Sequence, residues 1–201
     1  MSRIGRGLNR GLKGGSEPGR ATLLARLAEH VAYDEAEATA LAQIVEFVVL
    51  TDRCFDRGLS EGHVTGSAWV LDSDGSHVLL THHRKLGLWL QLGGHADGDA
   101  DVAAVALREA REESGLSAVR LASDAIFDVD VHRIPGRRDA AEHLHYDVRY
   151  RVEAERDAAL CVSVESHDLA WVELGRVEEL TTDASVMRMV RKSLDERREG
   201  A

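Results

Sequence analysis

Two periodicities divide the sequence into a helical N-terminal part and a strand-rich remainder. In residues 21–33 and 35–53 the leucines, isoleucine and valines recur every three or four positions, which predicts two amphipathic helices. Asp34 stands between them and is a suitable N-cap for the second helix. We expect these helices to pack on the rest of the chain or on a partner chain, and a homodimer is one arrangement that would cover them.

From His63 onward the period changes to the alternation typical of strands. The predicted strands span residues 64–72, 77–81, 88–92, 119–132, 142–153 and 168–173, and helical patterns return at 101–114, 177–180 and 185–197. Residues 73–76 form a hairpin turn signal, and 82–87 a loop. Strands that surround a helix predict an α/β fold, in which a mixed sheet carries helices on both faces. Residues 1–19, rich in Gly, Ser and Arg, predict a flexible tail.

Composition narrows the class of protein. A chain of 201 residues that is 44% hydrophobic can bury a sizeable core. A net charge of -10 argues against nonspecific nucleic-acid binding, which needs a basic surface. Cys54 and Cys161 are too few for a disulfide framework and predict reduced thiols. No apolar run approaches the ~20 residues that span a membrane, so we expect a cytoplasmic protein.

Three glutamates lie close together in the predicted helix at 101–114. Glu109, Glu112 and Glu113 occupy positions i, i+3 and i+4, which project from the same side of a helix. Like charges at this spacing repel one another. A divalent cation bound to this face would remove the repulsion, and Mg²⁺ prefers oxygen ligands while leaving positions for substrate phosphates. A glycine-rich loop precedes the helix, and Gly115 is a suitable C-cap.

The segment from Gly94 to Leu116 resembles the Nudix box, G-x5-E-x7-R-E-U-x-E-E-x-G-U, in which U is a bulky apolar residue. The matching positions are Gly94, Arg108, Glu109, Glu112, Glu113, Gly115 and Leu116. Ala100 stands where the pattern has its first glutamate, and Ala110 is a small version of the apolar position. The segments THHRKLG at 81–87 and GGHADGD at 93–99, with His-x-His-x-Asp at 143–147, are similar to a bacterial subgroup of this family.

This resemblance implies a fold, a reaction and a set of metal ligands. The fold is an α/β/α sandwich over a catalytic domain at 60–198, with a helical extension at 20–55 outside the common core. The reaction is attack of water on a phosphorus of the pyrophosphate in a nucleoside diphosphate linked to another group, with Mg²⁺, or Mn²⁺ in its place. The implied metal ligands are Glu109, Glu112, Glu113 and the Gly94 carbonyl, while Arg108 orients a box carboxylate. The expected partner is a small nucleotide.

Two predicted strands carry rows of histidine and aspartate. Alternation puts Asp128, Asp130 and His132 on one face and Phe127, Val129 and Val131 on the other; it likewise groups His143, His145, Asp147 and Arg149. A hairpin centred near Arg137 and Arg138 would place His132 opposite His143, and His145 opposite Asp130. The joint polar face would bind a metal such as Zn²⁺, substrate phosphates or a base edge; the alternative is a solvent-exposed sheet face.

Other residues near the box predict contact with the substrate. Arg84 and Lys85 form a cationic loop that is suited to clamp phosphates. Trp89 would stack on a base or belong to the core. His95 would contact the substrate or fix the loop by a hydrogen bond.

The sequence leaves the general base and one rival function open. A base must lie within hydrogen-bond reach of the attacking water. The candidates are Glu109, Glu112, His143, His145 and Glu165. The rival is a noncatalytic module that senses a nucleotide and signals through the N-terminal helices; the three intact box glutamates favour the enzyme.

Overall fold

Seven strands form one mixed sheet in the computed structural model, which describes residues 18–136, 141–164 and 166–199. They are β1 (Gly62–Asp72), β2 (His77–His83), β3 (Leu88–Leu90), β4 (Leu92–His95), β5 (Val119–Ile134), β6 (His143–Ala154) and β7 (Ser166–Glu173). Their order is β3-β2-β1-β6-β5, while β4 pairs with β1 and β7 with β2. β1 and β6 are parallel, and the remaining described pairs are antiparallel.

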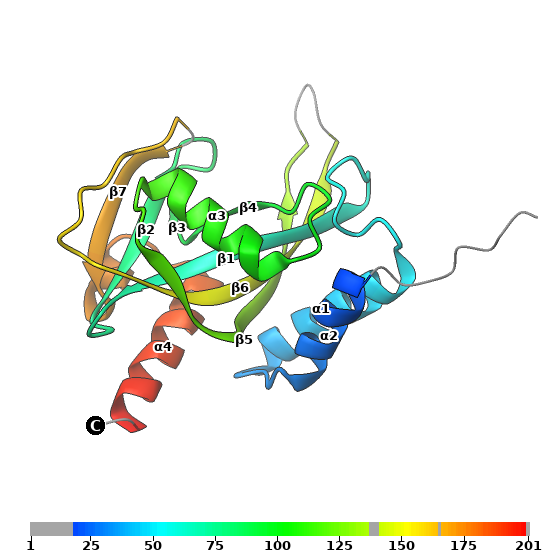
Figure 1. Cartoon of the computed structure of the whole chain (residues 1–201), viewed down its shortest axis with the longest axis horizontal. Coiled ribbons are helices and arrows are strands. Elements are labelled where there is room, and N and C mark those ends of the chain that lie inside the picture. The colour runs from blue at the N-terminus through cyan, green and yellow to red at the C-terminus, as the bar shows by residue number, and fades with distance from the viewer. Residues whose placement is uncertain (1–17, 137–140, 165, 200–201) are drawn as a thin grey trace, which may run out of the picture.

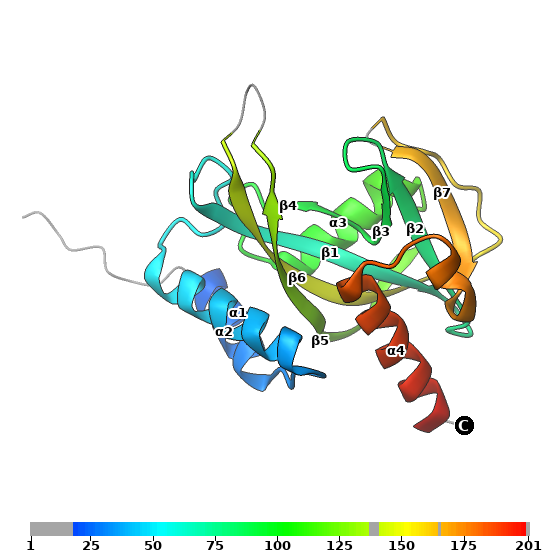
Figure 2. The ribbon, with the colours of Figure 1, turned by 180° about the vertical axis from the view of Figure 1, so that it is seen from behind.

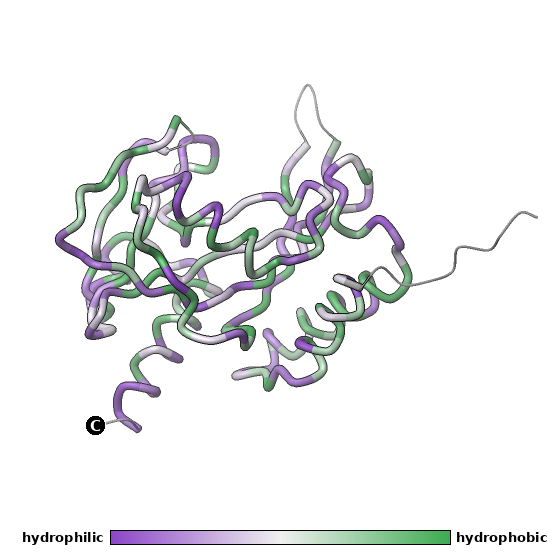
Figure 3. The backbone as a smooth tube through the Cα atoms, in the orientation of Figure 1, coloured by the Kyte–Doolittle hydropathy of each residue, from purple (hydrophilic) through white to green (hydrophobic). Residues whose placement is uncertain are grey.

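Helices cover both faces of this sheet, which confirms the predicted α/β fold and its N-terminal helices. The helices are α1 (Pro18–Glu29), α2 (Glu35–Leu50), α3 (Val102–Ser114) and α4 (Ala184–Glu199), with a 3-10 helix, η1 (Leu174–Glu179), before α4. α3 lies in front of the sheet in Figure 1 and behind it in Figure 2. Hydrophobic and hydrophilic positions alternate along α3 in Figure 3, as expected for a helix with one buried face.

The two faces of the sheet have separate hydrophobic cores. On one face, apolar side chains of α1, α2 and α3 share a buried cluster with β1, β5 and β6. On the other face, η1 and α4 pack against β1, β2 and β7. The N-terminal helices therefore pack on the chain's own sheet. α1 begins at Pro18, inside the predicted tail, whose residues 1–17 lie outside the described part.

β5 is an edge strand, and side chains from outside the sheet cover that edge. His30 Nδ1 lies 3.1 Å from the Ile126 carbonyl, and Glu37 accepts from the Val129 amide at 3.2 Å. From α4, Lys192 donates to the Phe127 carbonyl at 2.8 Å. The N-terminal helices and α4 thus satisfy backbone groups that would otherwise be open to another strand.

The β5–β6 hairpin differs from the prediction in its register. His132 pairs with His145, and Ile134 with His143, a shift of two residues from the expected pairs. Because side chains alternate with period two, this shift leaves the polar rows on the same face. The predicted turn at Arg137 and Arg138 lies outside the described residues.

Phe127 also departs from the expected alternation. The β5–β6 register is irregular between Ile126 and Asp128, and Phe127 packs with the core on the α4 side of the sheet. Val129 belongs to the core on the α3 side. This irregularity is a β-bulge that adds one residue to β5, so the Phe127 side chain lies on the face opposite to the one that strict alternation predicts.

Among the described residues, none of the helices combines the length and the apolar composition needed to cross a bilayer.

Candidate active site

α3 carries the three box glutamates and is held at both ends by local hydrogen bonds. Asp101 caps its N-terminus by accepting from the Ala104 amide at 3.2 Å. At the C-terminus, Gly115 adopts a left-handed conformation with φ 74°, and its amide bonds to the Arg111 carbonyl. These caps fix the start and the end of the helix, and hence the face on which the glutamates lie.

Gly94 brings β4 into direct contact with α3. A Cβ atom at this position would lie 2.5 Å from the carboxyl carbon of Glu109, closer than real Cβ contacts allow. Only glycine leaves room for the Glu109 carboxylate to lie against this strand. The pairing of Gly94 with Gly66 of β1 holds the strand in place.

Two further contacts join the helix to the same segment of backbone. Glu113 is buried and accepts from the Gly93 amide at 2.9 Å. Arg108 donates to the His95 carbonyl and to Glu109 Oε1, each at 2.9 Å. Glu112 lies exposed on the same helix. The structure therefore places the carboxylates of Glu109 and Glu113 against residues 93–95, with Arg108 beside Glu109.

The departure of the box at Ala100 has a steric explanation. A Cβ atom added to Gly19 of α1 would lie only 2.2 Å from the Ala100 Cβ. The start of α1 therefore packs directly on the position where the pattern has glutamate, and a longer side chain there would collide with the helix.

Five histidines gather on the sheet face opposite α3. His63 of β1 lies beside His145 of β6, with ring centroids 4.8 Å apart, and beside His95 of β4 at 5.0 Å. His132 and His143 each lie 5.3 Å from His145. Of these, His63 was not singled out from the sequence. It joins the group because β1 runs parallel to β6, a long-range register that local patterns do not reveal.

The joint polar face of β5 and β6 is partly buried by an ion network, and it is therefore not the solvent-exposed sheet face that was the alternative. We call this set the buried ion network: Glu37, Asp128, Asp147, Arg149, Arg188 and Lys192. Burial alone would raise the pKa of Asp128, but hydrogen bonding to Arg188 and the charges of Arg149 and Lys192 outweigh it and lower that pKa.

Asp147 lies inside this network. Its oxygens accept hydrogen bonds from Thr65 at 2.8 Å, Ser67 at 2.7 Å, Gln91 at 3.2 Å and Arg149 at 2.7 Å. Only 1% of Asp147 is exposed. Both oxygens are occupied, so we assign Asp147 to the support of the sheet rather than to contact with substrate.

The predicted phosphate clamp lies on the turn between β2 and β3. Arg84 and Lys85 are exposed there, and Arg84 donates to the Ser166 carbonyl at 3.1 Å. Trp89 stacks on His82 with centroids 5.1 Å apart and packs on the core of the α4 side. β2 extends to His83, so the loop is two residues shorter than predicted. Of the candidate bases, Glu165 lies outside the described residues.

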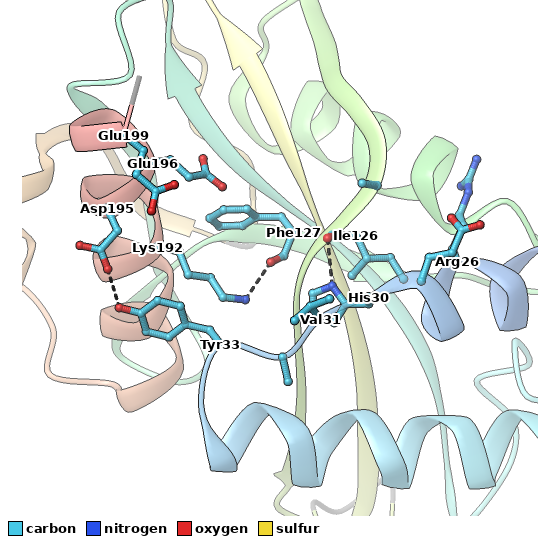
Figure 4. Close-up of a pocket in the computed structure, with 13 residues that line it drawn as sticks. Arg26, His30, Val31, Tyr33, Ile126, Phe127, Lys192, Asp195, Glu196 and Glu199 are labelled. Atoms are coloured by element: carbon cyan, nitrogen blue, oxygen red, sulfur yellow. Dashed lines mark hydrogen bonds between the residues drawn. The ribbon is translucent and has the colours of Figure 1, made fainter. Parts of the chain in front are cut away.

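A separate cavity of about 550 Å³ lies between the α1–α2 connection, β5 and α4 (Figure 4). His30 and Lys192 line it, and the Tyr33 hydroxyl donates to Asp195 at 2.7 Å. None of the residues that line it belongs to the box, so we do not assign it to the phosphate site.

Comparison with known proteins identifies the family. The family model for the NUDIX domain matches residues 62–192, which is more than half of the chain. The chain therefore belongs to the Nudix family. A comparison with curated proteins finds no match.

Solved structures with this fold include two hydrolases. An Ap4A hydrolase from C. elegans, in a binary complex, is 16% identical, with 69% of this chain and 98% of that chain covered and a TM-score of 0.53. The dihydroneopterin triphosphate pyrophosphohydrolase of E. coli is 13% identical, with 64% and 92% covered and a TM-score of 0.50. At sequence identities of 13% and 16%, the structural similarity shows only that the fold is shared.

Proposed function

We propose that this protein is a Mg²⁺-dependent Nudix pyrophosphohydrolase that cleaves a nucleoside diphosphate linked to another group. The proposal rests on α3, where Glu109 and Glu113 lie against the backbone of residues 93–95 and Glu112 lies exposed on the same helix. Family membership supports the reaction class. The subgroup marked by residues 81–87, 93–99 and 143–147 is part of the same proposal.

The chemistry of these donors fits a hard divalent cation. Glu109, Glu112, Glu113 and the Gly94 carbonyl offer only oxygen atoms, the ligands that Mg²⁺ prefers. Because Gly94 has no Cβ atom, the Glu109 carboxylate has room beside β4; a Cβ there would lie 2.5 Å from the carboxyl carbon. When bound, Mg²⁺ or Mn²⁺ would neutralise charge on the phosphate oxygens and hold the substrate in place.

The residues of the chain have distinct roles in this proposal. Arg108 and the Gly93 amide hold Glu109 and Glu113 in fixed positions, which reduces the movement needed when substrate binds. Glu112 is exposed and is the first candidate to take the proton of the attacking water.

Substrate contacts are proposed for two groups of residues. His95, His143 and His145 lie on the sheet face opposite α3, and His95 adjoins Gly94 in β4. Arg84 and Lys85 lie on the β2–β3 turn, where they would meet a phosphate or a distal group of the substrate. A small nucleotide is the expected partner, and a homodimer and a cytoplasmic location remain predictions.

A hydrolysis screen tests the proposal and finds the substrate. It covers nucleoside diphosphate sugars, dinucleoside polyphosphates, ADP-ribose, CDP-alcohols and NTPs, each with Mg²⁺ or Mn²⁺ and with an EDTA control. We expect one class to be cleaved only with metal. On that substrate Glu112→Gln should lower turnover at least ~100-fold, since a metal site supplies several kcal/mol of transition-state stabilisation.

Glu46→Gln is the matched control, because Glu46 is an exposed helical glutamate on α2. It should leave turnover unchanged. Near-normal activity of Glu112→Gln would refute the assigned roles. Tight nucleotide binding without phosphate release over hours would favour the rival function, a noncatalytic sensor.

A further inference from the structure

Three histidines from three neighbouring strands bring one ring nitrogen each close together. They are His63 of β1, His95 of β4 and His145 of β6, and one nitrogen of each lies within 4.8 Å of the others. β1 lies between the other two strands and pairs with both, so the backbone fixes the spacing of the group. These ligand atoms are nitrogens, whereas the box offers oxygens.

Three buried ring nitrogens in this group, two of His63 and one of His145, have no hydrogen-bond partner among the described residues. Only 2% of His63 is exposed, and neither of its ring nitrogens has a hydrogen-bond partner among the described residues. The same holds for Nε2 of His145. A buried polar group left unsatisfied costs about 1–3 kcal/mol, so such groups usually mark a missing ligand or water.

Burial affects the protonation of two of the three rings. Burial, together with the neighbouring histidines, lowers the pKa of His63 to about 4 and that of His145 to about 2. Both are therefore neutral at pH 7. Neutral imidazole is the form that coordinates a transition metal.

A second group with suitable atoms does not share these features. Asp72, Asp74 and His77 also lie within 4.8 Å of one another. The two carboxylates accept hydrogen bonds from the amide of Ser76, at 2.8 and 2.9 Å, and Asp72 also accepts from the amide of His77. Their role as the acceptors of the β1–β2 turn accounts for this group without a metal.

We propose that His63, His95 and His145 form a binding site for a divalent transition-metal ion of the zinc class, distinct from the magnesium site of the box. Zn²⁺ accepts imidazole nitrogens at about 2.0–2.1 Å in tetrahedral geometry, which places ligand nitrogens about 3.3 Å apart. The nitrogens, which lie within 4.8 Å of one another, would approach to that spacing by rotation of the side chains. Three protein ligands leave a fourth position for water or a substrate oxygen.

The site is linked to the box through one residue. His95 follows Gly94, and its carbonyl accepts the hydrogen bond from Arg108. A metal bound to the His95 ring would therefore tie β4 to β1 and β6 next to the box carboxylates. Zinc binding by these three histidines would not require the proposed hydrolase activity.

Metal binding to the full-length, untagged protein tests the site. Zn²⁺ is titrated against a chromophoric chelator in excess Mg²⁺, which occupies oxygen sites, and Co²⁺ absorption reports nitrogen coordination. We expect one Zn²⁺ per chain, a tetrahedral Co²⁺ spectrum and a rise in melting temperature with Zn²⁺. His63→Gln and His95→Gln should each raise Kd at least ~100-fold, because even residues behind metal ligands contribute 10–100-fold.

Control variants separate this site from the alternatives. His77→Gln and Glu112→Gln should keep the zinc affinity of the unchanged protein, so loss of hydrolysis in Glu112→Gln leaves the zinc result intact. His95→Cys should retain binding with a thiolate-to-cobalt absorption band, which also shows that substitution at this position leaves the fold intact. Less than one Zn²⁺ per chain in excess Mg²⁺, or unchanged affinity in both His63→Gln and His95→Gln, would overturn the proposal.

Discussion

Asp128→Asn removes the negative charge at the centre of the buried ion network while keeping the size of the side chain. Asp128 is fully buried, with an exposed fraction of 0%. Arg188 donates to both of its oxygens at 2.8 Å, Arg149 donates to one at 3.0 Å and Lys192 to the other at 3.0 Å. An asparagine would offer one acceptor and turn an NH₂ group toward cations.

The expected loss of stability follows from these contacts. Removing one partner of a buried ion pair costs about 3–5 kcal/mol, because the other charge is left uncompensated in a dry environment. Three cations contact Asp128, and each keeps at least one other carboxylate within 4.0 Å. We therefore expect a loss within this range and not a multiple of it, equivalent to a fall in melting temperature of about 6–20 °C.

Urea unfolding followed by circular dichroism measures this loss. Asp130→Asn is the matched control on the same strand and face. Asp130 is partly exposed, and its contacts with Arg149 and Arg188 are longer, at 3.4 and 3.6 Å. It should lose about 1 kcal/mol or less. Equal losses in the two variants, or a loss below about 1 kcal/mol for Asp128→Asn, would refute the reasoning.

Two glycines and one pH series give further predictions. Gly66→Ala places a Cβ 2.8 Å from the backbone of α3 and 2.9 Å from Val105, so it should cost about 1–3 kcal/mol by urea unfolding; unchanged stability would contradict the tight packing. In Gly94→Ala the three atoms nearest the new Cβ all belong to the flexible end of Glu109, so the variant should lower turnover on the substrate found in the screen with little change in stability. Full activity would contradict the role of that contact. Asp128 and Glu37 have lowered pKa values in the folded protein, so their ionised forms stabilise the fold above about pH 4–4.5. This stabilisation is lost as pH falls through the folded pKa values. A free energy of unfolding that increases from about pH 5 to about pH 3 would contradict this prediction.

The elements and the box were predictable because their signals are local. Caps such as Asp34 and Gly115, the turn at 73–76 and the period of the apolar residues identify helices and strands within short windows. The i, i+3, i+4 spacing of the glutamates likewise needs only a helix. The fold class followed from the order of these elements.

The partners of the polar face were not predictable, because they come from distant parts of the chain. Lys192 and Glu37 are 155 residues apart and form a buried pair. His63 reaches His145 through a parallel register. The hairpin register was wrong by two residues because a turn's centre is poorly fixed by sequence, whereas the face of each strand is fixed by alternation.

The pairing of Glu37 with Lys192 also has a consequence for the order in which the chain folds during synthesis. A ribosome adding about 5–20 residues per second needs roughly 8–30 s to make the 155 residues between them. Throughout this interval the Glu37 carboxylate of α2 cannot pair with the Lys192 ammonium group, which accompanies its burial in the folded protein. We therefore expect the N-terminal helices to dock last, after α4 has emerged, and to be the segment most open to chaperones and proteases in the nascent chain.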